Sequence, residues 1–189
     1  MSFLHRDTTL AMPPGLWTRP ATSSHNIRAW TETHYVAGTL LAGNPDDRLS
    51  DVLNRRQSFT IVNAHVVPHG APISAECIQS EAVLDPYDLD FVLGGPLEER
   101  DMPIREARRI HKVRYPVLVI GKSFEIRGTI HLLPGNSPEF ATLHNGTLFL
   151  PVTNQHVRRY GRVVSGPDSD VGFVNRHAIA QIRQLDTLH

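Results

Sequence analysis

The sequence lacks the features that mark several classes of protein. It has one cysteine, Cys77, so the chain cannot form an internal disulfide. No run approaches the roughly 18 apolar residues of a membrane helix, and no basic start followed by an apolar stretch marks export. Net charge is absent too, because 19 Lys and Arg balance 19 Asp and Glu, so no overall field favours nucleic acid or an anionic membrane. We expect a soluble, cytoplasmic protein without membrane insertion.

Motifs for catalysis and for metal or nucleotide binding are also missing. The sequence has 11 histidines but no HxH, HExxH or CxxC, and its one pair four apart, His65 and His69, falls in a strand-like run. Ser165 lies in no GxSxG elbow, and the glycines form neither a P-loop nor a dinucleotide fingerprint. A catalytic site that is assembled only in three dimensions remains an alternative. The sequence predicts no catalytic residue, no metal ligand and no cofactor, and favours a protein that is not an enzyme.

What the sequence does contain is a repeat. The hexapeptide IVNAHV at 61–66 returns as VTNQHV at 152–157. Four blocks recur in the same order: 35–41 with 124–132, 42–54 with 134–145, 59–67 with 150–158, and 76–84 with 172–180. Because chance rarely supplies four collinear matches, we predict an internal duplication in which Gly38 corresponds to Gly128 and Val66 to Val157.

Each repeat reads as a small β unit with one short helix. The β-branched runs predict strands, and the Asn44–Pro45 pair followed by two aspartates is typical of a helix start. We therefore predict four parts: an arm at 1–25, a first unit at 26–84, a charged connector at 85–114 and a second unit at 115–189. The fold class is mainly β, with two tandem bent-sheet or barrel units.

Residues 1–25 contain three prolines and show no sustained helix or strand period, which indicates an irregular arm. Its apolar side chains are more numerous than a free tail needs. They pack either on their own chain or on a neighbour, and Phe3, Leu10 and Trp17 are the predicted contact residues for a partner.

The connector is divided by charge, with acidic residues over 85–104 and basic residues over 105–114. It is either a solvated linker or a basic patch that acts with a second cluster at 158–162. The residues of this anion or nucleic-acid hypothesis are Arg105, Arg108, Arg109, Lys112, Arg158, Arg159 and Arg162.

The repeated polar residues have an ordinary structural interpretation. Asn63 and His65, like Asn154 and His156, are two apart, so we expect each pair to share one strand face and to have no catalytic role.

Two resemblances support the repeat. RLSDVLN at 48–54 and FVNRHAI at 173–179 resemble an uncharacterised family of small bacterial domains, often duplicated, whose function is unknown. GKSFEIRGTI at 121–130 is similar in rhythm to Sm-like β-barrels. Both resemblances imply a fold, namely duplicated Sm-like units, and neither implies an activity.

The sequence therefore favours a non-catalytic binding or assembly protein that acts through protein–protein contacts of its β units, with itself or with a larger assembly as partner. Exposed strand edges would be the natural contact sites. The alternative is an Sm-like nucleic-acid-binding module that uses the two basic clusters.

Overall fold

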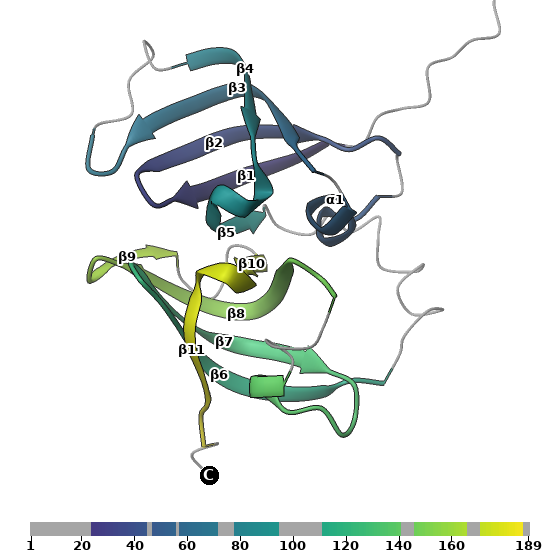
Figure 1. The fold of residues 1–189 in the computed structure, drawn as a ribbon. Coiled ribbons are helices and arrows are strands. Elements are labelled where there is room, and N and C mark those ends of the chain that lie inside the picture. Colours follow the sequence, from purple (N-terminus) through teal and green to yellow (C-terminus); the bar gives the residue numbers. More distant parts are fainter. Residues whose placement is uncertain are drawn as a thin grey trace, which may run out of the picture.

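The computed structural model describes residues 24–44, 47–55, 57–71, 78–94, 111–140, 146–165 and 171–186. Within these residues the chain is mainly β, as predicted, and its strands form one open antiparallel sheet of eleven strands (Figure 1). No helix in these ranges is long and apolar enough to cross a membrane.

The N-terminal half, residues 24–94, contains five strands. In chain order its elements are β1 (Ser24–Thr31), β2 (His34–Leu41), the helix α1 (Leu49–Arg55), β3 (Phe59–Pro68), β4 (Ile78–Leu84), the 3₁₀ helix η2 (Pro86–Asp88) and β5 (Leu89–Gly94). Helix α1 buries Val52 and Leu53 and carries Asp51 in its first turn, where a negative charge suits the helix dipole.

The C-terminal half, residues 113–184, has a similar series of elements. They are β6 (Val113–Gly121), β7 (Phe124–Leu132), β8 (Phe149–Arg159), β9 (Arg162–Ser165), β10 (Val171–Asn175), the 3₁₀ helix η4 (Arg176–Ala178) and β11 (Ile179–Gln184). Residues of β8 alternate between buried and exposed over much of its length, because successive strand side chains point to opposite faces.

The two halves pair their strands in the same order. The sheet runs β11-β6-β7-β8-β10-β5-β1-β2-β3-β4, with β9 beside β8. Each half therefore contributes its last strand, then its first, second and third, then the strand before its 3₁₀ helix. The register also recurs, since Ile27 lies opposite Gly38 in one half and Val117 lies opposite Gly128 in the other.

A bulge at the same place in each half explains the repeated NxHV motif. Asn63 and Asn154 both have φ 51°, in the left-handed region that asparagine tolerates better than most residues. Each lies where β3 or β8 shifts register against its neighbouring strand. The bulge interrupts the alternation just before the asparagine, and beyond it Asn154 and His156 share the exposed face of β8 with Gln155 buried between them, as the sequence predicted.

Opposite each bulge lies a glycine with no room for a side chain. A Cβ on Gly38 would lie 2.9 Å from the carbonyl oxygen of Val62, and a Cβ on Gly128 would lie 2.9 Å from that of Thr153. Only glycine allows two backbones to approach so closely. The Gly–Thr dipeptide of the sequence repeat therefore has a steric cause.

The structure differs from the predicted boundaries in one important respect. Residues 85–94, assigned to the connector, form η2 and the buried strand β5. The predicted match of 172–180 with 76–84 is therefore wrong in register. By strand pairing, Gly172 is equivalent to Ala82, and Ile179 is equivalent to Leu89. Strands β1 and β6 also begin slightly earlier than the predicted units, at Ser24 and Val113.

Candidate interaction surfaces

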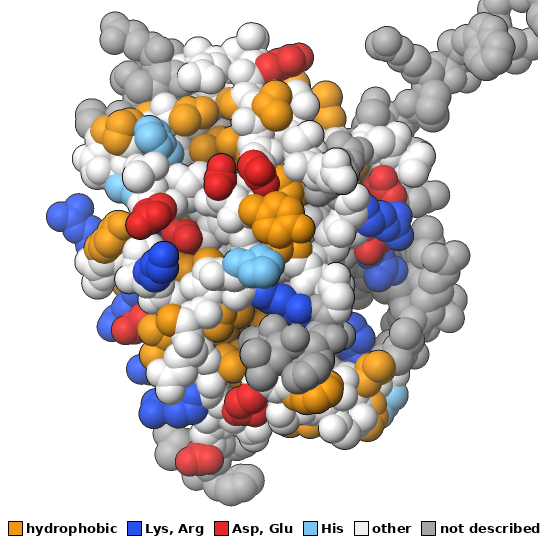
Figure 2. Space-filling model, viewed as in Figure 1, with side chains coloured by type: hydrophobic (Ala, Val, Ile, Leu, Met, Phe, Trp, Pro, Cys, Tyr) orange, Lys and Arg blue, Asp and Glu red, His pale blue; other side chains and the backbone are white. Residues whose placement is uncertain are grey.

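The exposed basic residues gather on the C-terminal half. Lys112, Arg158 and Arg162 of the predicted anion-binding set are exposed, and Figure 2 shows Lys and Arg side chains along one margin of the lower half, with acidic side chains among them. Arg158 lies opposite Glu125 in the β7–β8 pair. This neighbouring carboxylate reduces the attraction of Arg158 for an anion.

A shallow hollow opens on this surface between β7 and β8. It is lined by Glu125, Arg127, His156 and Arg158, and Arg127 lies directly opposite His156. The hollow could hold an anionic group against the two arginines, but Glu125 shares it. The site residues Arg105, Arg108 and Arg109, and the arm residues Phe3, Leu10 and Trp17, lie outside the described residues.

A second basic group lies where β6 begins. Arg114 pairs with His131 across the β6–β7 ladder, and His131 Nε2 is 2.9 Å from the hydroxyl oxygen of Thr153. Burial lowers the pKa of His131 below its ordinary value of 6.5, and the charges of Arg114 and Lys112 lower it further. The lowered pKa favours the neutral form of His131, so Arg114 and Lys112 carry the positive charge of this group.

Arg159 is the exception in the predicted basic set, because it is buried. Its guanidinium donates to the Asp90 carboxylate at 3.0 Å and to the backbone oxygens of Thr31 at 2.7 Å and Glu32 at 3.2 Å. It also lies 2.9 Å from His69 Nε2. With its side chain only 3% exposed, Arg159 is unavailable to a ligand in solution and instead ties β8 to the N-terminal half.

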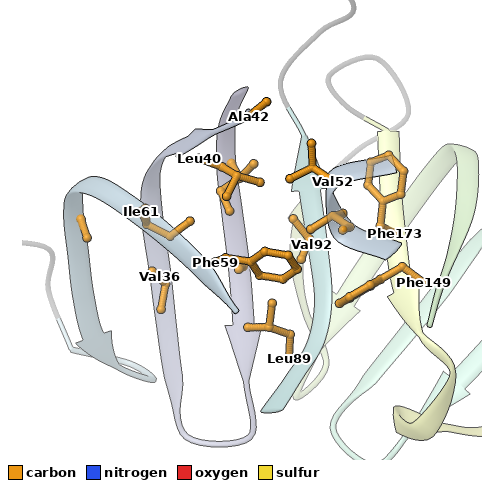
Figure 3. Close-up of a cluster of buried hydrophobic side chains, with 14 residues drawn as sticks. Val36, Leu40, Ala42, Val52, Phe59, Ile61, Leu89, Val92, Phe149 and Phe173 are labelled. Carbon is orange, nitrogen blue, oxygen red and sulfur yellow. The ribbon is translucent and has the colours of Figure 1, made fainter. Parts of the chain in front are cut away.

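The junction between the halves is an antiparallel strand pair. Strand β10 pairs with β5 over four residues, from Val171 opposite Gly94 to Val174 opposite Phe91. Side chains cross this junction in both directions. Phe149 and Phe173 pack into the hydrophobic core of the N-terminal half (Figure 3), whereas Trp30, Phe91 and Leu93 pack into that of the C-terminal half.

Two asparagines reinforce the junction. The Asn54 side chain accepts from the Phe149 backbone N–H at 2.7 Å and donates to its carbonyl at 3.4 Å. Asn175 donates to the carbonyls of Pro86 and Leu89 at 3.2 and 2.7 Å. Each asparagine thus satisfies backbone groups of the other half, as buried backbone requires.

Neither asparagine was predicted from the sequence as a junction residue, but a local signal for strand β5 was present. Asp85 and Asn175 each accept a hydrogen bond from the backbone N–H two residues later and so begin η2 and η4. Leu89 and Ile179 then begin strands β5 and β11. A polar cap followed by an aliphatic residue four positions on therefore marks both segments and would have placed β5 within the first repeat.

The main path of the sheet ends in two edge strands, while the off-path strand β9 pairs with β8 alone in the part of the chain that the structure describes. Strand β4 pairs with β3 alone and β11 with β6 alone among the described residues. Both strands are short and mostly exposed. On β4, Ile78 is 50% exposed and Val83 72% exposed. Edges of this kind offer backbone hydrogen-bonding groups and apolar side chains to another chain.

Within the described ranges, no group of three or more His, Cys, Asp or Glu residues is placed to hold a metal ion. Comparison with protein-family models, curated proteins and solved structures found no match for this chain. The resemblances to a bacterial domain family and to Sm-like barrels therefore remain hypotheses drawn from the sequence.

Proposed function

We propose that this protein is a non-catalytic assembly protein, built from two copies of one Sm-like β unit, that acts through protein–protein contacts at its exposed sheet edges. The N-terminal arm adds contacts to the assembly. The observation that carries the proposal is the open sheet itself, whose two terminal strands, β4 and β11, lack a second strand neighbour among the described residues.

The duplication is supported by repeated pairing. The β1–β2 and β6–β7 ladders match at an offset of 90 positions, as between Ile27 and Val117. The offset is also 90 for the strands that follow the 3₁₀ helices, from Leu89 to Ile179. Shared bulges, glycines and strand order are expected if one ancestral unit was copied, because both copies then inherit the same backbone features.

Assembly is supported by what already holds the two halves together. Their junction combines a strand pair, buried aromatic side chains and backbone contacts from asparagine, which are the components of a stable protein–protein interface. One surface of each unit is therefore suited to binding another unit. The described surface shows no comparable arrangement for a small molecule, since its basic hollow is shallow and shared with Glu125.

Size-exclusion chromatography with light scattering tests the proposal on the full chain. We expect a mass above that of one chain that rises with protein concentration. Deletion of residues 2–20 should lower the degree of assembly while the far-ultraviolet circular dichroism spectrum keeps its β signal. A full-length protein that stays monomeric at high micromolar concentration, and from which no partner is recovered, would contradict the proposal.

A further inference from the structure

The junction inside the chain is a template for a contact between chains. Strand β10 pairs with β5 in a defined register in which Phe173 lies opposite Val92. Phe173 then packs into the core of the half that contains β5. The pairing joins the strand before the 3₁₀ helix in one half to the strand after the 3₁₀ helix in the other.

Each molecule also presents counterparts of both junction strands, each with only one strand partner among the described residues. By strand order and register β4 is the counterpart of β10, and β11 is the counterpart of β5. Both are terminal strands of the sheet, and they lie at its opposite ends (Figure 1). The free edge of β4 on one copy can therefore meet the free edge of β11 on the next copy, as β10 meets β5 within the chain.

We infer that the chain binds a second copy of itself head to tail, with β4 of one copy paired antiparallel to β11 of the next in the register of the internal junction. This inference rests on the assembly function proposed above and specifies its partner. Transferring the register by 90 positions places Val83 opposite Ile182 and Glu81 opposite Gln184.

The exposure of Val83 fits this pairing. Val83 occupies on β4 the position that Phe173 occupies on β10. Phe173 is 5% exposed because the other half covers it, whereas Val83 is 72% exposed. A β-branched apolar side chain opposite an isoleucine is a favourable cross-strand pair, so a second copy would bury the side chain that the single chain leaves in solvent.

The contact should be weaker than the internal junction. On the other face of β11, Gln181 and Arg183 stand where β5 has Phe91 and Leu93, both of which are buried. The free edge therefore loses two apolar anchors and carries a charge, which limits edge-to-edge growth. Because the two edges differ, the contact is heterologous, so it builds a closed ring or an open filament.

Disulfide trapping tests both the partner and the register. In a Cys77→Ser background, chains carrying Val83→Cys alone and Ile182→Cys alone are mixed under mild oxidation, one of them with a size tag. Directly opposed strand residues lie within disulfide range. We expect the mixed dimer to exceed either homodimer at least fivefold, and the double variant Val83→Cys/Ile182→Cys to form a ladder of covalent oligomers.

The control double variant is Val83→Cys/Arg183→Cys, in which the second cysteine is moved by one residue to the opposite strand face. Its ladder should be at most one fifth as intense. Equal ladders, dominant homodimers or no cross-link would overturn the inference. Light scattering on the Cys77→Ser protein distinguishes failure of the inference from failure of the proposed function. Assembly without the 83–182 cross-link would contradict only the β4–β11 register. A monomer at every concentration would contradict the assembly function as well.

Discussion

Arg158 and Arg159 are adjacent in β8, yet the first faces solvent and the second is buried against the N-terminal half. A count of charges along the chain places both in one basic cluster. A strand sends neighbouring side chains to opposite faces, so such a cluster is divided as soon as its strand is recognised. Which face is buried depends on a junction with residues more than 60 positions away, and that information is not local.

At the residue scale, the first prediction concerns Arg159. Arg159→Met should lower the free energy of unfolding by about 3 kcal/mol, because it leaves Asp90 and two backbone carbonyls without their buried donor. Urea denaturation measures the change. The matched control Arg158→Met alters the neighbouring exposed arginine and should stay within about 0.5 kcal/mol of the original protein.

The double variant Asp90→Asn/Arg159→Met should recover part of the loss, because it removes both charges rather than one. Similar midpoints for Arg159→Met and Arg158→Met would show that Arg159 does not hold the halves together.

At the scale of elements, the sequence repeat predicted the strands better than their ends. The alternating β-branched runs and the Gly–Thr dipeptides located β2 and β7, since pattern and steric demand are both local. Strand β5 was missed because FVLG is a short, continuous apolar run in a charged neighbourhood. Its burial also depends on its pairing with β10, a strand distant in the sequence. The bulges at Asn63 and Asn154 were not predicted, since a positive φ is not visible in a single sequence.

The glycines opposite the bulges give the second prediction. Gly38→Ala should destabilise the protein by about 1–3 kcal/mol, because the new Cβ would lie 2.6 Å from a side-chain carbon of Ile61 and 2.9 Å from the Val62 carbonyl oxygen. Gly128→Ala should act alike. Gly146→Ala is the control, since no heavy atom lies within 4 Å of its Cβ position.

Thermal unfolding followed by circular dichroism compares the three glycine variants. A small shift for Gly146→Ala and comparable losses for the other two would support equivalent bulges in the two halves. A stable Gly38→Ala protein would contradict the close backbone approach.

At the scale of the whole molecule, balanced charge argues against the nucleic-acid alternative. We predict no specific RNA binding at physiological salt, because Glu125 lies among the exposed basic side chains of the hollow and the net charge is +0. Fluorescence anisotropy with a short single-stranded RNA at two salt concentrations measures this. Sub-micromolar binding that weakens steeply with salt and is lost in Arg158→Ala/Arg162→Ala would favour the alternative instead. Arg159 is left intact in that test because its role is structural.

The sequence could predict that the chain is mainly β, but not that its two halves would share one sheet. That arrangement depends on β10 meeting β5 and on aromatic side chains entering the opposite core, contacts between positions about 80 residues apart. Strand edges become visible only once the order of the whole sheet is known. The candidate surface at β4 and β11 therefore came from topology, and the predicted basic set contributed no residue to either strand.

Assembly through the sheet edge is tested most directly by the solution mass of Val83→Lys, measured by sedimentation velocity beside the unaltered chain and Val163→Lys. Val163 is a second exposed valine, 57% exposed, and lies on β9, an edge strand that pairs with β8 alone among the described residues and takes no part in the proposed β4–β11 contact. A lysine on a pairing edge opposes strand addition. We predict that the unaltered chain and Val163→Lys assemble alike as concentration rises, whereas Val83→Lys stays a folded monomer. Assembly of Val83→Lys equal to that of the unaltered chain, or an unaltered chain that is monomeric throughout, would contradict the account.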